Sequence, residues 1–308
     1  MPTGWRKFLP RRSLGRNPSG KMARPMGNHE RRTISEVRLG GKSPGQILGR
    51  ALIPLLSRQQ AFLDRPVVPL MLAAAPIHRR RNLAIRLLGL SPHFSDHPVG
   101  AARIDVLERE FNRNVASRRA ICANLIRPSL VPGMSLLDFG CGPGYLAKAV
   151  SEFAGQVIGV DVSRGVIACA QVLNAAPNIS YRVSRDPNIT CVPDEEIDFV
   201  YSIAVLQHLD KKLTRAVFKG LHRVLKPGGV GVCHFMAGDT AAALNQGELT
   251  GWEKWLKLRM VTFTPAEMAE LAGSAGFTKI VAEPIARRAT IDDDVGRQHV
   301  VYFEKPTR

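Results

Sequence analysis

Residues 136–146 combine residue types and spacing that suit the binding of a nucleotide-like ligand. They read Leu136-Leu137-Asp138-Phe139-Gly140-Cys141-Gly142-Pro143-Gly144-Tyr145-Leu146. An apolar run followed by closely spaced glycines predicts a buried strand, a tight turn and the start of a helix. Glycine lets the backbone approach a ligand closely, and adenosine-containing cofactors commonly occupy such a turn. Glycines also serve turn geometry alone, so the surrounding chain has to decide between the two readings.

Two acidic residues stand near this loop. Asp161 ends the next apolar run, 17 residues after Gly144, where a carboxylate can accept hydrogen bonds from a ribose diol. Its alternative role is to cap the following helix, a role for which Ser163 competes. Asp138 precedes the loop and can pair with a cationic amino group of a cofactor. The third glycine is one place too early for the G-x-G-x-x-G fingerprint of nicotinamide dinucleotides, so the pattern favours a different nucleoside.

Strand and helix patterns alternate from residue 134 onward, which predicts a Rossmann-like, doubly wound α/β fold. Two C-terminal runs without a helix between them, 280–282 and 300–303, predict an antiparallel hairpin at one edge. We expect one helix over 101–128, ended by Pro128. Further strands are expected at 134–139, 156–161, 179–183, 197–203 and 229–235, and further helices at 144–153, 164–174, 211–224 and 265–275.

Several stretches together resemble the class I S-adenosylmethionine-dependent methyltransferases, in particular their broad small-molecule type. The resemblance covers about residues 104–304 and rests on an ordered set of motifs. They are Leu136–Gly144, Val160-Asp161-Val162-Ser163, Asp186, the stretch from Ile197 to Leu209, Leu225-Lys226-Pro227-Gly228-Gly229, and Thr264–Met268 with Ala275-Gly276-Phe277.

The resemblance implies S-adenosylmethionine as cofactor and a seven-stranded sheet with one antiparallel strand near the C-terminus. The residues that it places at the cofactor are Asp138, Gly140, Cys141, Gly142, Asp161, Val162, Asp186 and Ala204. Asp186 corresponds to an acid near the adenine. Arg185 departs from the small residue common there, and it offers Asp186 an alternative partner.

Methyl transfer needs an acceptor atom held in line with the sulfonium and shielded from water. A base is required only where the acceptor must first lose a proton. The resemblance makes His208 the candidate base, because the turn after the fourth strand faces the methyl group; the alternative is that His208 supports that turn. The histidines and cysteines show no zinc-ligand spacing, and the five cysteines are typical of a reduced, intracellular protein.

Charge and apolar composition together divide the chain into three parts. Of the 308 residues, the first 100 carry 18 Lys/Arg and 4 Asp/Glu, whereas residues 101–308 carry 25 and 22. Residues 1–45 are interpreted as a solvated basic tail, with an organellar presequence or a nucleic-acid-binding arm as alternatives. Residues 46–100 are expected to form a helical cap packed on the main domain, or else an interfacial membrane anchor. Residues 101–308 form the expected methyltransferase domain.

The predicted function is methyl transfer to O, N or C of a small-molecule or lipid-like acceptor in the cytoplasm. The insert at 237–262, with Trp252 and Trp255, is expected to cover the acceptor as a lid. One alternative is an RNA methyltransferase that uses the basic arm; the nearly neutral catalytic region and the absence of an Asn/Asp-Pro-Pro-aromatic motif argue against it. Another is a binding module that retains S-adenosylmethionine without catalysis. The apolar run at 66–78 is too short to span a bilayer, which needs ~20 residues.

Overall fold

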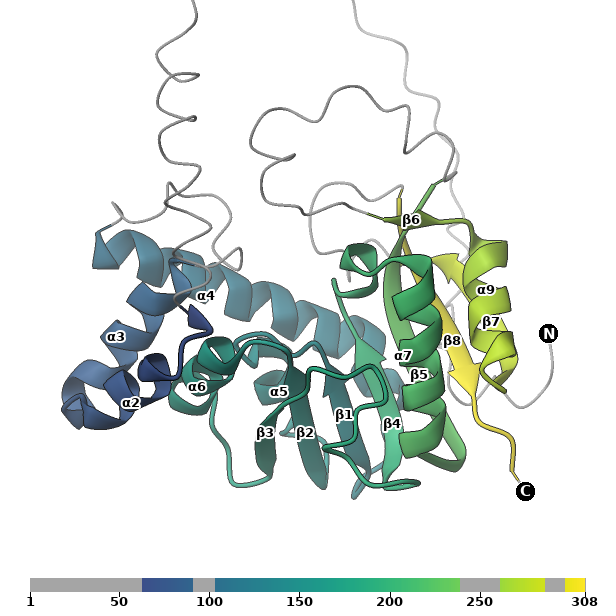
Figure 1. Ribbon diagram of the computed structural model, residues 1–308, viewed down its shortest axis with the longest axis horizontal. Coiled ribbons are helices and arrows are strands. Elements are labelled where there is room, and N and C mark those ends of the chain that lie inside the picture. Colours follow the sequence, from purple (N-terminus) through teal and green to yellow (C-terminus); the bar gives the residue numbers. More distant parts are fainter. Residues whose placement is uncertain (1–62, 91–102, 239–260, 286–296, 308) are drawn as a thin grey trace, which may run out of the picture.

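The computed structural model describes residues 63–90, 103–238, 261–285 and 297–307. Within them an eight-stranded sheet runs in the order β3-β2-β1-β4-β5-β8-β7, and the short β6 pairs with β5 (Figure 1). The strands are β1 (Ser135–Phe139), β2 (Gln156–Asp161), β3 (Ile179–Val183), β4 (Ile197–Ser202), β5 (Leu225–Ala237), β6 (Thr262–Phe263), β7 (Thr278–Pro284) and β8 (Gln298–Glu304).

The strand directions confirm the expected fold class. Strands β1 to β5 pair in parallel, whereas β8 runs antiparallel to both of its neighbours, β5 and β7. The C-terminal hairpin therefore forms as the sequence predicts. The sheet differs from the seven strands implied by the resemblance only through β6, whose two residues pair with the end of β5.

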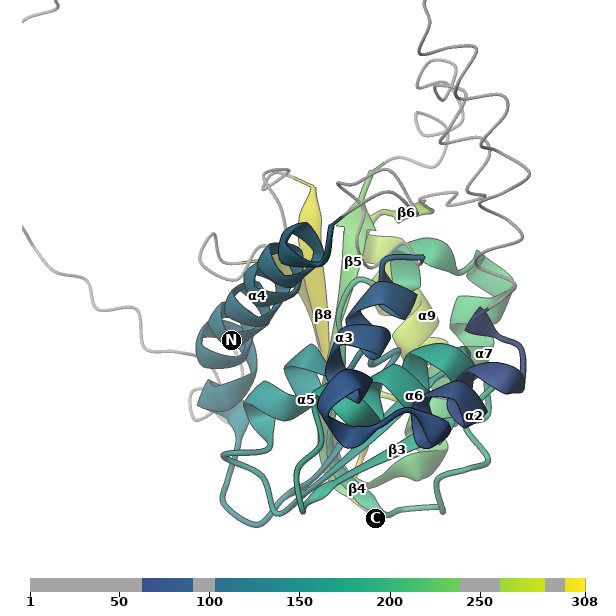
Figure 2. The ribbon, with the colours of Figure 1, turned by 90° about the vertical axis from the view of Figure 1, so that its left-hand side faces the viewer.

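Helices cover both faces of the sheet. They are α2 (Val67–Ala74), α3 (Ile77–Leu88), α4 (Ile104–Ile121), α5 (Tyr145–Val150), α6 (Arg164–Leu173), α7 (Lys211–Val224) and α9 (Pro265–Ser274). Successive strand residues point to opposite faces: Leu136 belongs to a buried cluster that includes the α5 side chains, whereas Leu137 belongs to one that includes those of α7 and α9. Figure 2 shows α4 and α5 on one side of the strands and α7 and α9 on the other. Because both faces are buried, the parallel strands read as continuous apolar runs.

Several elements depart from their expected bounds, and two of the departures have a clear physical reason. The helix expected over 101–128 is regular only to Ile121; a π-helical turn (Cys122–Ile126) and a 3-10 turn (Arg127–Ser129) follow it. Pro128 lacks an N–H, so regular helical hydrogen bonding cannot continue through it, although Arg127 before it keeps helical backbone angles (φ −50°, ψ −38°). Strand β5 begins at Leu225 rather than 229, because Leu225 already pairs with Ile197 before a register shift in the ladder.

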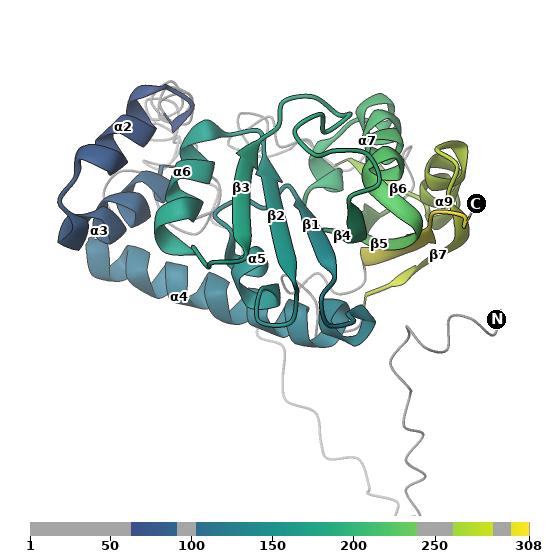
Figure 3. The ribbon, with the colours of Figure 1, turned by 90° about the horizontal axis from the view of Figure 1, so that it is seen from below.

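Helices α2 and α3 pack against the rest of the molecule. Their inward side chains, such as Val68 and Ile85, share an apolar cluster with Phe111 of α4 and Val166 of α6. Figure 3 shows α2 and α3 together at one end, beside α6 and the start of α4. Across the described ranges, none of the helices has the length and hydropathy needed to cross a bilayer. The predicted tail, residues 46–62, Trp252 and Trp255 lie outside the described residues.

Candidate functional site

The glycine loop joins β1 to α5 and requires glycine for two separate reasons. Gly140, Gly142 and Gly144 have φ angles of 75°, 52° and 80°, which favour glycine because it has no Cβ. A Cβ on Gly140 would lie 2.3 Å from Val205 Cγ2, and one on Gly144 would lie 2.2 Å from Tyr181 Oη. The loop is thus confined between β2, β3 and the turn after β4. The Gly140 and Cys141 amides both donate to the Val160 carbonyl, at 2.8 and 2.9 Å.

Asp138 lies at the end of β1 with an unused carboxylate oxygen. Its side chain is 3% exposed, and its Oδ2 has no hydrogen-bond partner. Burial raises the pKa of this carboxyl to about 8; the Asp161 carboxylate adds to the rise, and the Tyr201 hydroxyl opposes it. A buried polar oxygen without a partner is uncommon in folded proteins. An ammonium group placed here would supply the missing donor and favour the ionised carboxylate.

Asp161 fastens the glycine loop to the end of β2. Its Oδ2 accepts a hydrogen bond from the Gly142 amide at 3.0 Å, and its Oδ1 accepts one from the Ser163 amide at 2.9 Å. Ser163, rather than Asp161, is the N-cap of α6, since its hydroxyl accepts from the Val166 amide. Each carboxylate oxygen has a further lone pair, so Asp161 can also accept from a diol.

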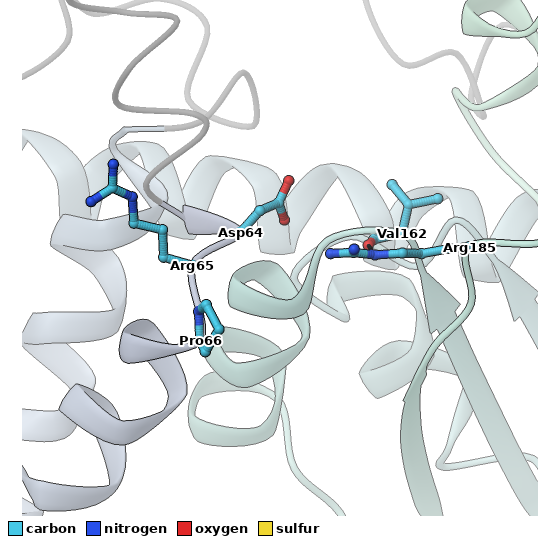
Figure 4. Close-up of a pocket in the computed structure, with 5 residues that line it drawn as sticks. All are labelled: Asp64, Arg65, Pro66, Val162 and Arg185. Atoms are coloured by element: carbon cyan, nitrogen blue, oxygen red, sulfur yellow. Dashed lines mark hydrogen bonds between the residues drawn. The ribbon is translucent and has the colours of Figure 1, made fainter.

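An open cleft of about 520 Å³ lies beside the end of β2. It is lined by Asp64, Arg65, Pro66, Val162 and Arg185. In Figure 4 the Asp64 carboxylate and the Arg185 guanidinium point toward the space between them, and Arg65 points away. The Val162 side chain is 64% exposed. The segment before α2 therefore contributes one wall, and Asp64 is fixed there by the Ser163 hydroxyl, which donates to it at 2.7 Å.

Arg185 does not take up the alternative pairing with Asp186. Its Nε donates to the Val162 carbonyl at 3.4 Å, whereas Asp186 Oδ2 accepts from the hydroxyl and the amide of Thr190, at 2.7 and 3.3 Å. The hydrogen bond from the Thr190 hydroxyl is the largest cause that lowers the pKa of Asp186. Asp186 is therefore ionised at neutral pH, and its Oδ1 has no partner.

The turn after β4 brings Ala204 and His208 to the same edge of the sheet. Ala204 has a φ of 62°, which is rare for a residue with a Cβ and typical of functional turns. His208 ends a 3-10 turn (Leu206–His208) and is exposed there. Desolvation by the neighbouring protein lowers the pKa of its imidazole. His208 is accordingly neutral at pH 7 and able to accept a proton.

His234 is a residue that the sequence analysis missed. It lies on β5, is 1% exposed, and neither ring nitrogen has a hydrogen-bond partner. Burial, together with the charges of Arg118, His299 and His208, lowers the pKa of His234 to about 4. The ring is thus neutral, and the turn that carries His208 packs against β5, the strand of His234. A single histidine inside the apolar run Val230–Met236 was the available signal.

Comparison with known proteins links this geometry to methyl transfer. A family model described as a methyltransferase domain matches residues 137–233, which contain the glycine loop, Asp161 and His208. Ubiquinone biosynthesis O-methyltransferase of Ruegeria pomeroyi is 25% identical over 217 residues, 66% of this chain and 79% of that protein. N-demethylindolmycin N-methyltransferase of Streptomyces griseus is 33% identical over 97 residues, 31% of this chain and 41% of that protein.

Among solved structures, phosphoethanolamine N-methyltransferase 2 of Haemonchus contortus aligns with a TM-score of 0.47 at 19% identity, covering 68% of this chain and 62% of that chain. The similarity to methyltransferases lies instead in the matched domain, in the relatives named above, and in a glycine loop with flanking acids at the carboxyl ends of β1 and β2. Residues 137–233 of this chain thus form a methyltransferase domain of the S-adenosylmethionine-dependent type.

Proposed function

We propose that the enzyme methylates a hydroxyl oxygen of a small, largely apolar molecule. The observation that carries the proposal is a pair of histidines on elements in contact: His208 in the turn after β4, and the buried His234 on β5, whose ring nitrogens lack partners. The pKa of each imidazole is lowered by burial. A hydroxyl acceptor has to lose its proton as it is methylated, and a neutral imidazole can take it. The R. pomeroyi relative, named as an O-methyltransferase of ubiquinone biosynthesis, supports an oxygen acceptor on an apolar molecule.

The residues around the glycine loop fit the cofactor. S-adenosylmethionine supplies an electrophilic methyl group on a sulfonium. Asp138, with its unpartnered Oδ2, would hold the cofactor's ammonium group. Asp161 would accept from the ribose diol. Val162, which lines the cleft, and Asp186 would lie against the adenine. Gly140, Cys141, Gly142 and Ala204 would contribute backbone at the points of closest approach.

The assignment of Asp161 predicts a loss of cofactor affinity. Asp161→Ala removes both the proposed diol contact and the hydrogen bond to the Gly142 amide, so we expect the affinity for S-adenosylhomocysteine to fall at least tenfold. Titration calorimetry measures the change. Asp194→Ala is the matched control, because it removes another carboxylate, one that pairs with Arg223 in the loop before β4 and lies away from the proposed diol site. Unchanged affinity in Asp161→Ala would overturn the assignment.

Two roles are open to His208, and they differ in one measurable respect. If His208 accepts the proton, His208→Ala should lower turnover about 10²-fold or more and leave cofactor affinity intact. In addition, the acidic limb of the wild-type rate profile should lie below pH 6.5, because protonation of an imidazole with a lowered pKa occurs at lower pH. An equal loss of turnover and cofactor affinity would instead assign His208 a supporting role in the turn.

The acceptor class is tested with methyl-labelled S-adenosylmethionine. The full chain is incubated separately with simple phenols, prenylated phenols, primary amines and RNA, and products are identified by mass spectrometry. We expect the label on a phenolic or alcoholic oxygen. Label found only on amines or only on RNA would contradict the proposal, and His208→Ala serves as the low-activity reference.

A further inference from the structure

An apolar patch covers the outward face of α2 and the start of α3. Eight large hydrophobic side chains are exposed among the described residues, and half of them lie between residues 67 and 77. These four are Val67, Leu70, Met71 and Ile77, with exposed fractions of 42%, 67%, 37% and 78%. Three of them lie three or four residues apart on α2, so they share one face of that helix. We call this set the α2 patch.

Helix α2 is apolar all round, although only one side of it is covered. Its eight residues read VVPLMLAA, without a polar side chain. Val68 and Leu72 are buried in the cluster shared with α3, α4 and α6, while the α2 patch faces outward. A surface helix normally carries polar residues on its outer side, and a helix that is hydrophobic all round is normally buried. The outer face of α2 therefore lacks the polar residues expected of contact with water.

Basic residues surround the α2 patch, and acidic ones are absent from its sequence. No Asp or Glu occurs between Asp64 and Asp96, whereas this stretch contains five arginines. Of these, Arg65, Arg79 and Arg86 are exposed. The other two have partners: Arg80 donates to the Ala73 and Ala75 carbonyls at the end of α2, and Arg81 pairs with Glu108. Apart from Asp64 at its start, the exposed charges that flank the α2 patch along the chain are thus positive.

The α2 patch is held in a fixed position. The buried side chains Ala84, Ile85 and Leu88 of α3 anchor the helix pair to α6 and α4. The Arg81 guanidinium also lies over the Phe111 ring, 5.5 Å from its centre. Figure 2 presents α2 and α3 toward the viewer, in front of α6. The apolar side chains cannot turn inward, because the inner face of the helix pair is already packed.

We propose that the α2 patch binds the surface of a membrane that contains anionic lipids. Leu70 and Ile77 would enter the boundary between headgroups and acyl chains, and Arg65 and Arg79 would contact lipid phosphates. A partly apolar helix with a basic rim is the arrangement that binds interfaces in this way. A second copy of the chain is a poorer occupant, because it would bring two basic rims together. The proposal does not depend on the identity of the methyl acceptor.

The α2 patch adjoins the proposed cofactor cleft in the sequence. Arg65 and Pro66 line the cleft and are followed directly by Val67 of the α2 patch. A membrane bound to α2 would therefore lie next to the wall of the cleft that Asp64 and Arg65 build.

Vesicle flotation of the full chain tests the proposal. We expect binding to phosphatidylcholine vesicles that contain phosphatidylglycerol, weaker binding to phosphatidylcholine alone, and weakening by salt. The affinity of the double variant Leu70→Ser/Ile77→Ser for the vesicles should fall at least about tenfold. Arg79→Glu should lose affinity mainly for the anionic vesicles. These side chains are exposed, so the fold should tolerate the changes, and circular dichroism and S-adenosylhomocysteine affinity check this.

Matched controls come from exposed residues elsewhere. Val131→Ser removes an exposed apolar side chain, and Lys212→Glu reverses an exposed charge on α7; both should bind like the wild type. Equal binding by the α2 patch variants and the wild type would overturn the proposal, as would no binding to either vesicle. A dimer in light scattering that Leu70→Ser/Ile77→Ser dissociates would assign the α2 patch to a second copy of the chain instead.

Discussion

Asp138 and His234 are both buried polar side chains with hydrogen-bonding atoms that lack partners, which destabilises the fold. Each is almost fully buried, and each carries polar atoms without a hydrogen-bond partner. Leaving such a group unpaired costs about 1–3 kcal/mol. Folding stability alone would favour an apolar residue at either position. Departures of this kind concentrate at functional sites, which is why both residues belong in the proposed site.

The raised pKa of Asp138 makes a prediction about stability and pH. The carboxyl has an ordinary value of 3.8 and a folded-state value of about 8, so between these values the folded protein keeps a proton that the unfolded chain has lost. Stability should therefore fall as pH rises from 5 to 8. Asp138→Asn removes this dependence, because the amide does not titrate.

Urea unfolding of the cofactor-free protein at several pH values measures the effect. Relative to the wild type, Asp138→Asn should gain on the order of a few kcal/mol between pH 5 and pH 8. Asp198→Asn is a useful reference, since Asp198 is less buried and pairs with Lys226. A constant difference between Asp138→Asn and the wild type across this range would show that Asp138 is already ionised in the folded protein.

The sequence singled out Asp138 and Asp161 as candidates because both stand at fixed distances from a glycine motif. It missed His234 because a lone histidine in an apolar strand carries no spacing signal. Only the structure brings His234 near His208 and reveals that its nitrogens lack partners. Likewise, the sequence offered Asp186 either a place near the adenine or a pairing with Arg185. In the structure Asp186 accepts from Thr190 rather than from Arg185, and this contact arises from loop geometry.

At the scale of elements, local signals predicted most of the fold. Strands β2 and β3 and helix α7 have the predicted bounds, since apolar runs, periodicity and helix caps are read locally. Asp210 caps α7, and Thr264 with Glu267 forms a capping box for α9. The early start of β5 and the addition of β6 depend on pairing with distant strands. Nonlocal pairing of this kind leaves no mark in a short stretch of sequence.

Gly144 of the glycine loop and Gly133 of the turn before β1 form a matched pair for substitution. Gly144 and Gly133 have similar φ angles, 80° and 87°, so alanine at either should cost ~1 kcal/mol for the left-handed backbone. A Cβ on Gly144 would also clash with Tyr181 Oη, whereas one on Gly133 meets nothing within 4 Å. We expect Gly144→Ala to lower the free energy of unfolding by at least ~1 kcal/mol more. Equal losses in a chemical denaturation experiment would mean that Tyr181 moves freely away.

At the scale of the whole molecule, composition separated the basic N-terminal third from a nearly neutral remainder. It left open whether residues 46–100 pack on the main domain or bind a membrane. For α2 and α3 the two are compatible, because one side of the pair is packed and the other is apolar and exposed. A helix that serves two surfaces has no clear one-sided pattern, so the sequence could not separate these roles.

The position of β8 has a consequence for how the protein is made. It is the last described strand along the chain, yet it lies between β5 and β7, which are both translated earlier. A nascent chain that stops short of residue 304 leaves β5 with an open edge and β7 without its partner. Open strand edges recruit other chains. Completion of the sheet must therefore wait until the C-terminal segment leaves the ribosome, and a chaperone that shields the β5 edge until then would be most useful late in synthesis.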